Sequence, residues 1–502
     1  MNDKKLRFTR SLLGLGLGAA LALTYIASCN NETTSGTDAG GSSPDMTMTG
    51  GEVDMTTVAA PVVTQAAPDA IGNTGGTTIV LTGQNFVQGA TVMIGGSAAT
   101  NVVVTSPTTI TLTVPGKAGT CGATQVVVTN PDGKSGNASN ILRYRSNTFG
   151  FMPAASTAMG SLNGPRNLVV TDFTGDGKPD VLVSLLTPGM VSLLPGTGGA
   201  TFGTAMTTTV GTQPRAIAYG LIDADTKLDA VVVNSGSNTA SVLLGTGTGT
   251  FTAKTPVSTG NSPNAVALRD FDGDGKLDMV VANPGGGTGM GSLTIALGNG
   301  DGTFKTPSSM TIPVGSTGIA VGDLNQDGKL DLAISHGAQG TVSYLAGSTN
   351  GTFAAPLSVN AGGPTAKADD VVIGDFNGDQ KLDLAVANSG TNNVTTIFSQ
   401  GAGSFSATLQ TTPTGGMGPN SLISVDLNGD GFLDLVTANQ LGTNVSVMLG
   451  ATGGKFGNGT VYSVGTGPFY VASSDLNGDL QPDLISSNGG AGNVSVLLSQ
   501  CN

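Results

Sequence analysis

The stretch DFDGDGKLDMVVAN, residues 270–283, decides how most of this chain folds. Aspartates stand at positions 270, 272, 274 and 278, glycines at 273 and 275, and an apolar run follows. A short apolar run bounded by turn residues predicts a β-strand. Carboxylates at alternate positions of a tight loop are ligands that calcium prefers. One such loop fits either an active site or a structural metal site, so its repetition along the chain decides between them.

The pattern D-x-[DNT]-x-D-G-x-x-D recurs seven times with departures, and we call each copy an Asp loop. The loops start at 49- to 53-residue intervals, at Asp172, Leu221, Asp270, Asp323, Asp375, Asp426 and Asp475. Each unit also has a Phe that opens a strand, at Phe149, Phe202, Phe251, Phe304, Phe353, Phe405 and Phe456. A period near fifty residues is typical of a propeller or solenoid. Four strand-like segments in each unit predict a seven-bladed β-propeller.

The two ends of the repeat region predict how the propeller closes. The region opens with TFGFMPAAST before any Asp loop and ends with NVSVLLSQCN, after which the expected Phe strand is missing. We therefore expect this N-terminal outer strand to complete the last blade, which leaves no open sheet edge.

The repeats resemble FG-GAP/VCBS repeats, the blades of the integrin α-subunit head, over nearly all of residues 147–502. The Asp loops and the Phe-Gly pairs at Phe149, Phe202 and Phe456 carry the resemblance. It implies a calcium-binding propeller with a partner-binding face opposite the Asp loops. In this chain that face would include Arg166, Arg215, His336, Asn283, Asn388, Asn439 and Asn488.

Residues 61–145 have a different character, with short strand-like runs between Gly, Pro and Asn turns, the pattern of a β-sandwich. They resemble the IPT/TIG family of immunoglobulin-like domains. The resemblance lies in Gly75-Gly76-Thr77, Gly83-Gln84-Asn85-Phe86, Val114-Pro115 and Val128-Thr129-Asn130-Pro131-Asp132-Gly133. It implies a spacer or adhesive module.

We expect each Asp loop to bind calcium through side chains at loop positions 1, 3, 5 and 9 and the carbonyl at position 7. Leu221 occupies position 1 of the second loop, so we expect that site to be weak or empty. An EF-hand is excluded because its loop has twelve residues and ends in Glu between helices. Zinc or iron is disfavoured because His and thiolate ligands are missing. The alternative is that the D-G and N-G pairs only form hairpin turns.

The predicted calcium ligands are Asp172, Thr174, Asp176, Lys178, Asp180; Asp223, Asp225, Asp229; Asp270, Asp272, Asp274, Lys276, Asp278; Asp323, Asn325, Asp327, Lys329, Asp331; Asp375, Asn377, Asp379, Lys381, Asp383; Asp426, Asn428, Asp430, Phe432, Asp434; and Asp475, Asn477, Asp479, Gln481, Asp483.

The N-terminus has the features of an export signal. Four basic residues precede the apolar stretch SLLGLGLGAALALTYIA, which ends in Ile26-Ala27-Ser28-Cys29. This ending resembles the bacterial lipobox, which implies lipidation at Cys29 and anchoring to the cell envelope, at the outer membrane or cell surface in a Gram-negative cell. An uncleaved signal anchor is the alternative. The Gly/Ser/Thr-rich residues that follow predict a flexible tether.

Cys121 and Cys501 then remain, and an even pair in an exported protein predicts a disulfide. The predicted strand neighbours of both residues meet near residues 144–148. Two free or buried thiols are the alternative.

Charge and missing motifs restrict the function. The formal net charge of −13 argues against a nucleic-acid partner, because phosphate contacts need clustered Lys and Arg. The single histidine, His336, follows a predicted strand end, where we expect a turn-capping role. No Ser-His-Asp set, GxSxG elbow or phosphate-binding loop is found, so we predict that the chain is not an enzyme.

The predicted protein is all-β. It has a signal peptide (1–28), a tether (29–58), an immunoglobulin-like β-sandwich (59–145) and a seven-bladed β-propeller closed by an N-terminal outer strand (146–502). We expect an exported, lipid-anchored, calcium-binding monomer at the cell surface that acts as a binding or adhesion module for a protein or glycan. The alternatives are an envelope scaffold that recruits other proteins, and a hydrolase or lyase with its site opposite the Asp loops.

Overall fold

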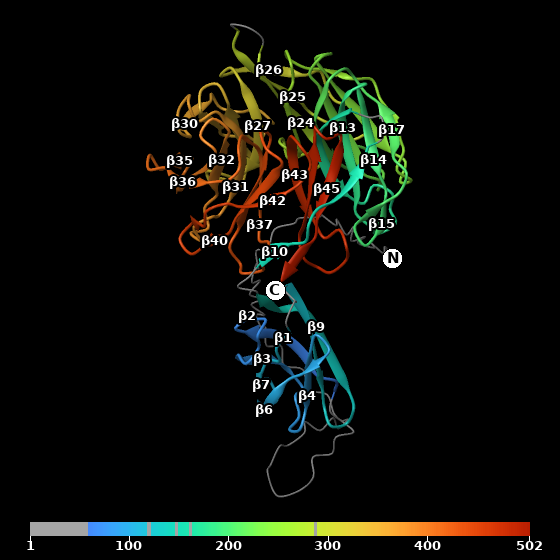
Figure 1. The fold of residues 1–502 in the computed structure, drawn as a ribbon, viewed down its shortest axis with the longest axis vertical. Helices are drawn as coiled ribbons and strands as arrows, with labels where there is room; N and C mark the ends of the chain where they lie inside the picture. The colour runs from blue at the N-terminus through green and yellow to red at the C-terminus, as the bar shows by residue number, and fades with distance from the viewer. Residues whose placement is uncertain (1–58, 118–121, 146–148, 160–162, 286–288, 502) are drawn as a thin grey trace, which may run out of the picture. The chain divides into compact units, whose positions relative to one another are not determined.

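The computed structural model describes residues 59–501 except 118–121, 146–148, 160–162 and 286–288, and its regular structure is all β-strand (Figure 1). No helix occurs among these residues, so none of them forms a helix able to cross a membrane. An all-β chain fits the expected β-sandwich and propeller. The predicted signal peptide, Cys29 and the tether up to residue 58 lie outside the described residues.

The strands of residues 62–145 form two sheets around one core. Strand β3 shows why they pack this way, because Ile79 and Leu81 are buried while Val80 between them is 37% exposed. Tyr144 is also buried, and its hydroxyl donates to the Pro115 carbonyl over 2.8 Å. The first sheet contains β1 (Val62–Ala67), β3 (Thr78–Gln84), β7 (Thr109–Thr113) and β6 (Thr100–Ser106), and the second contains β2 (Ala70–Gly72), β9 (Ser135–Arg145), β8 (Gly122–Thr129), β4 (Thr91–Ile94) and β5 (Ser97–Ala98).

Seven larger antiparallel sheets are found in the described part of residues 149–501, and we number them as repeat sheets 1 to 7. Sheet 1 has β12 (Asn163–Thr171), β13 (Asp180–Thr187), β14 (Met190–Leu194) and β17 (Met206–Thr209); sheet 2 has β18 (Pro214–Gly220), β19 (Asp229–Asn234), β20 (Thr239–Gly245), β21 (Phe251–Ala253) and β22 (Val257–Ser258); sheet 3 has β23 (Ala265–Arg269), β24 (Asp278–Asn283), β25 (Gly291–Ala296) and β26 (Ser308–Ile312); sheet 4 has β27 (Ser316–Gly322), β28 (Asp331–His336), β29 (Thr341–Leu345) and β30 (Leu357–Asn360).

The remaining sheets include strands from both ends of the repeat region. Sheet 5 has β31 (Ala368–Gly374), β32 (Asp383–Asn388), β33 (Asn393–Ile397) and β36 (Gln410–Pro413); sheet 6 has β37 (Pro419–Val425), β38 (Asp434–Asn439), β39 (Asn444–Met448) and β42 (Thr460–Ser463); sheet 7 has β43 (Pro468–Ser474), β44 (Asp483–Asn488), β45 (Asn493–Leu497) and β11 (Ala155–Ala158). Short pairs join β10 (Phe149–Phe151) to β46 (Ser499–Cys501), β15 (Gly196–Gly198) to β16 (Thr201–Phe202), β34 (Ser399–Gly401) to β35 (Ser404–Phe405), and β40 (Gly450–Ala451) to β41 (Lys455–Phe456).

Hydrophobic clusters join each repeat sheet to its neighbours. Every residue of the second strand is buried in sheets 2 to 7, because both faces of that strand pack against other sheets. Val231 of sheet 2 and Met279 of sheet 3 share one cluster, and Val183 of sheet 1 and Ile485 of sheet 7 share another. Burying such a side chain stabilises the fold by about 1.5–3 kcal/mol. The packing therefore links the first and last sheets as well as sequence neighbours.

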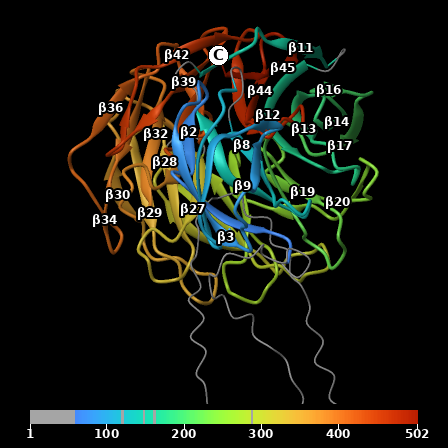
Figure 2. The same ribbon diagram turned by 90° about the horizontal axis from the view of Figure 1, so that it is seen from below.

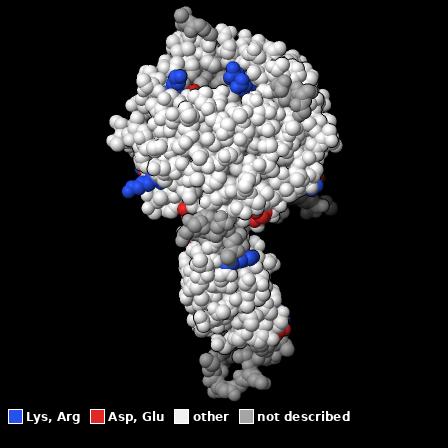
Figure 3. All heavy atoms as spheres, viewed as in Figure 1, with Lys and Arg blue, Asp and Glu red and all other residues white. Residues whose placement is uncertain are grey.

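Figure 2 shows the repeat sheets standing radially around a common centre. The first strand of each sheet lies nearest that centre, and β12 contacts both β18 and β43. Strand β11 pairs antiparallel with β45, from Ala155 opposite Val496 to Ala158 opposite Asn493. Few spheres in the view of Figure 3 have the colours of charged residues, as expected for a chain with 11% charged residues.

Candidate functional site

Each Asp loop lies between the first and second strands of its repeat sheet, so the seven loops occupy the same end of the sheets. Position 9 begins the second strand and is fully buried in all seven loops. In the third loop, Asp278 Oδ2 accepts the N–H of Phe271 over 2.9 Å, and Oδ1 accepts the N–H of Gly298 over 2.8 Å. The same two bonds recur in the other loops, at Asp180, Asp229, Asp331, Asp383, Asp434 and Asp483.

These bonds give position 9 a role that the sequence reasoning missed. The carboxylate joins the start of its own loop to the backbone just after the third strand, which is twenty residues further on at Asp278 and sixteen in the other six loops. Burial raises the pKa of Asp383 to about 6 and that of Asp434 to about 7. The nearby carboxylates of Asp426 and Asp430 add repulsion at Asp434. A cation beside such a group would offset both effects.

Position 1 holds the turn of the loop through backbone hydrogen bonds. Asp270 accepts the N–H groups of Gly273 and Asp274 on Oδ1, and that of Gly275 on Oδ2. The bonds from positions 5 and 6 recur at Asp172, Asp323, Asp375, Asp426 and Asp475. Leu221 cannot accept them, and its side chain is 45% exposed. These bonds are also typical of Asp-based turns, so the loop geometry alone does not require a metal.

Positions 3, 5 and 7 complete each loop. Asp274 Oδ1 accepts the N–H of Lys276, and its Oδ2 lies 3.0 Å from Lys276 Nζ. Ion pairs of the same kind join Asp176 to Lys178, Asp225 to Lys227, Asp327 to Lys329 and Asp379 to Lys381. Asn325, Asn377, Asn428 and Asn477 at position 3 each accept the N–H of position 5. The ion pairs are exposed, and such pairs contribute little to stability.

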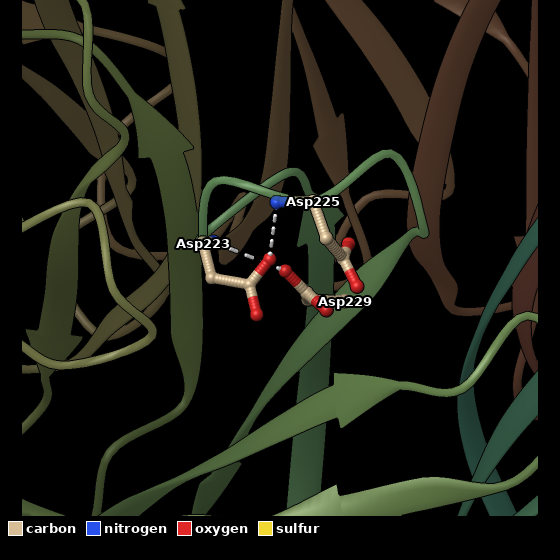
Figure 4. A group of neighbouring side chains, drawn as sticks. All are labelled: Asp223, Asp225 and Asp229. Carbon is tan, nitrogen blue, oxygen red and sulfur yellow. Dashed lines mark hydrogen bonds between the residues drawn. The ribbon is translucent and has the colours of Figure 1, made fainter.

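Two loops bring three carboxylates together among the described residues. Oxygens of Asp270, Asp272 and Asp278 lie within 4.8 Å of one another, and so do those of Asp223, Asp225 and Asp229 (Figure 4). The other loops have Thr or Asn in place of the position 3 carboxylate. Oxygen donors of this type fit calcium. The second loop, for which we expected a weak or empty site, therefore still gathers its three carboxylates, and its occupancy stays a prediction.

A second feature lies at the opposite end of the first strands, where they surround a cavity of about 230 Å³ that we call the central cavity. Six of the seven residues that stand six positions before each Asp loop line it. At Gly318 an added Cβ would lie 2.4 Å from Asp370 Oδ1, so a larger residue there would collide with this carboxylate. The seven residues, which we call the first-strand ring, are Arg166, Arg215, Asn264, Thr317, Asp369, Asn420 and Phe469, and Arg166 is the one outside the lining.

Polar side chains around the cavity tie each sheet to the next. Asn264 Nδ2 donates to the Thr317 carbonyl over 3.0 Å, and Thr317 Oγ1 donates to the Ala368 carbonyl over 2.9 Å. Asn420 Nδ2 donates to the Phe469 carbonyl over 3.1 Å. These bonds hold the ring in place and leave the carbonyl oxygens of both amide side chains for other donors.

Two arginines lie together on one side of this ring. Arg166 lies over the Phe469 ring, 4.3 Å from its centroid, and its Nε is buried without a hydrogen-bond partner. Arg215 Nε donates to Ser235 Oγ over 3.4 Å. Burial lowers the pKa of both guanidinium groups, and the charge of Arg215 lowers that of Arg166 further. No carboxylate in the described part of the chain forms an ion pair with either arginine.

Two adjacent aspartates lie across the ring from the arginines. Burial raises the pKa of Asp369 and raises that of Asp370 to about 7. Asp370 accepts the N–H groups of Val371 and Leu422, each over 2.9 Å, which opposes the rise, while the charge of Asp369 adds to it. The buried hydroxyl of Tyr470 also feels the charge of Asp370.

The raised pKa of Asp370 predicts a pH-dependent stability. Its folded-state pKa is about 7, against an ordinary value of 3.8, so its stabilising contribution is complete below about pH 4 and is lost as pH rises towards 7. The Asp370→Asn variant lacks this titration. We expect its melting temperature, relative to the native chain, to rise between pH 4 and 7 in differential scanning calorimetry. A difference that stays constant over this range would contradict the assignment.

The histidine and asparagines expected on a ligand-binding face are instead buried. His336 and the asparagines that end the second strands are fully inaccessible. His336 Nε2 lies 2.8 Å from Ser343 Oγ, and Asn388 Nδ2 donates to Thr395 Oγ1 over 2.7 Å. Burial also lowers the pKa of His336 to about 4, so it is neutral at pH 7. The bonds reach the adjacent third strand, so these side chains cross-link strands and are not surface groups.

The predicted disulfide falls partly outside the described residues. Cys121 lies outside the described residues, and the side chain of Cys501 is not described either. The backbone of Cys501 pairs with Phe149, and Gly122, which follows Cys121, pairs with Tyr144. The strand neighbours are thus those expected, and the Cys121–Cys501 bond stays a prediction.

Comparison with protein-family models finds both the repeats and the N-terminal domain that the sequence predicted. The family model described as FG-GAP-like repeat matches residues 222–281, 270–334, 375–437 and 426–486. The model described as IPT/TIG domain matches residues 61–144. The predicted FG-GAP repeats and IPT/TIG domain are therefore confirmed. No curated protein matches the sequence.

Solved structures resemble the chain only distantly. An auxiliary nutrient binding protein from Bacteroides ovatus is 14% identical, with a TM-score of 0.39 over 88% of this chain and 98% of that one. BBS1N in complex with ARL6DN is 14% identical, with a TM-score of 0.49 over 69% and 96%. An Agrocybe aegerita lectin that recognises non-reducing terminal N-acetylglucosamine is 16% identical, with a TM-score of 0.44 over 76% and 96%. At this level of similarity these structures do not indicate what the chain binds.

Proposed function

We propose that the chain is an exported, lipid-anchored, calcium-binding surface protein that acts as a binding or adhesion module for a protein or glycan. The central cavity is the observation that supports this most strongly. It is lined by hydrogen-bonding side chains and by the half-buried Arg215, which has no carboxylate partner in the described part of the chain. Concave sites with a few convergent polar groups are the usual places for ligands.

The fold that we infer for the repeat region is a seven-bladed propeller closed by the N-terminal strand β11. Three observations support it: β11 pairs with β45, sheets 1 and 7 share a hydrophobic cluster, and the Ser487 hydroxyl donates to the Arg166 carbonyl. In such a ring the Asp loops and the central cavity lie at opposite ends of the first strands. Calcium at the loops would then support the scaffold, while the other face would be open to a ligand.

The proposed anchor rests on the sequence around Cys29 and gives the binding face a place at the cell envelope. Lipidation at Cys29 is tested by labelling cells with a lipid precursor and comparing the native chain with Cys29→Ala. We expect lipid incorporation in the native chain alone. Equal incorporation in both, or in neither, would contradict lipidation at Cys29.

The binding function is tested with the purified full chain in detergent, presented to glycan arrays and to fractionated envelope extract. We expect saturable binding to one glycan or protein class in calcium. Binding should fall after EDTA treatment if the loops support the ring. Absence of saturable binding to either set of probes would contradict the proposal, and binding only to proteins of the chain's own envelope would favour the scaffold alternative.

One observation favours the enzyme alternative, because burial raises the pKa of Asp370 to about 7 beside the central cavity, as in many acid–base catalysts. Against it, both carboxylate oxygens accept backbone N–H groups. We therefore expect no turnover of glycans in an activity screen. Turnover that is lost in Arg215→Ala, while the variant stays folded, would establish a hydrolase or lyase instead; His336→Ala is less informative because that residue is buried.

A further inference from the structure

The size of the central cavity restricts what it can bind. Its volume of about 230 Å³ is below the roughly 300–1,000 Å³ typical of sites for drug-sized ligands. A single sugar ring or a compound of similar size is therefore a suitable occupant. A folded protein segment would engage only the rim of the cavity.

The charges around the cavity restrict the ligand's chemistry. Arg166 and Arg215 come from neighbouring sheets 1 and 2, and Arg166 Nε is a buried donor without an acceptor. Buried donors without partners are unfavourable, and two adjacent guanidinium groups repel each other. A carboxylate that enters the cavity would reach Arg215, which lines it, and its charge would offset the repulsion between the two guanidinium groups. Guanidinium groups bind carboxylates through paired N–H donors.

The rest of the lining fits hydroxyl groups and one apolar face. Asn264 and Asn420 use their amide nitrogens to bond neighbouring strands, so their amide oxygens can accept from a ligand hydroxyl. Asp369, on sheet 5, adds a carboxylate acceptor on the side away from the arginines. Phe469 provides an aromatic ring beside them, against which the C–H face of a sugar ring can pack.

We propose that the central cavity binds a small hydroxylated carboxylate, in the form of an acidic sugar residue of a surface glycan. The carboxylate lies at Arg215, the hydroxyl groups face Asn264 and Asp369, and the ring packs beside Phe469. This inference rests on the proposed binding function and adds the ligand class and the residues that select it.

The test is isothermal titration of the full chain in detergent and saturating calcium with glucuronate, glucose and acetate. We expect saturable glucuronate binding, and binding of glucose and acetate at least about tenfold weaker. Arg215→Gln should weaken glucuronate binding at least about tenfold, as loss of a charge-assisted hydrogen bond predicts. Arg215→Lys, which keeps the charge, should recover part of the loss.

Arg269→Gln is the matched control, because Arg269 is exposed at the far end of β23 and its Nη1 donates only to the Leu268 carbonyl. It should bind glucuronate like the native chain. Equal binding of glucuronate and glucose, or unchanged glucuronate binding in a folded Arg215→Gln variant, would overturn the ligand class. If glucuronate fails but another glycan or envelope protein still binds, the cavity proposal is wrong and the binding function stands. If nothing binds, both are wrong.

Discussion

Treatment with EDTA is expected to lower the thermal unfolding midpoint of the full chain by on the order of 10 °C or more. Oxygens of Asp270, Asp272 and Asp278 lie within 4.8 Å of one another, and without a cation these carboxylates repel. A cation held at one hundred times its dissociation constant stabilises the folded state by roughly 2.7 kcal/mol per site. Six of the seven loops have oxygen donors at all four side-chain positions, so the contributions accumulate.

Recovery of the midpoint on adding calcium back is the first control for this experiment. Magnesium at the same concentration should restore less, because it requires near-octahedral geometry and gives up its water reluctantly. Differential scanning calorimetry measures the unfolding midpoint after EDTA treatment, after calcium is added back, and after magnesium is added instead. A midpoint that EDTA leaves unchanged would mean that the Asp loops are not structural calcium sites.

Replacement of Asp331 by alanine is expected to reduce the free energy of unfolding by about 2–6 kcal/mol. This position 9 carboxylate accepts the N–H groups of Leu324, Asn325 and Gly347, over 3.0, 3.2 and 2.7 Å. The hydroxyl of Tyr344 also donates to it over 3.3 Å. The contacts from Leu324 and Tyr344 are buried, and alanine leaves both donors without this acceptor at a cost of about 1–3 kcal/mol each.

Asp301→Ala is the matched control, because Asp301 is an exposed loop aspartate that bonds to Thr303. Its effect should stay within about 0.5 kcal/mol. Denaturant unfolding with excess EDTA separates the two roles of Asp331. The backbone role predicts that most of the loss persists without calcium. A loss that disappears in EDTA would show that Asp331 acts only through the metal.

The repeats and their loops were predictable because their signals are local. Each loop pattern spans only nine residues. The family matches confirm the predicted FG-GAP repeats and the predicted IPT/TIG domain. The roles within a loop were harder to predict because the partners are distant. Asp278, for example, bonds Gly298 beyond the third strand, and Phe271 packs edge-to-face on Phe353 of the next repeat at 5.4 Å.

The central cavity was missed for a similar reason. Its residues come from successive repeats, about fifty positions apart, and form no local motif. The repeats did contain a signal for the cavity at one fixed position. The residue six positions before each Asp loop is always Arg, Asn, Thr, Asp or Phe. Asn388 and its counterparts misled the prediction in the other direction. Polar residues at strand ends suggest exposure, but a Ser or Thr hydroxyl on the adjacent strand accepts from each amide nitrogen of these buried side chains.

The proposed protein divides its roles, because the Asp loops support the fold while ligand binding occurs at the other end of the first strands. The most direct measurement compares ligand binding by the native chain, Arg215→Gln and Asp270→Asn in saturating calcium, using the glycan or protein identified on the arrays. We expect Arg215→Gln to lose affinity at least about tenfold, while Asp270→Asn binds normally but melts at a lower temperature. Lost binding in folded Asp270→Asn, with unchanged binding in Arg215→Gln, would contradict this division of roles.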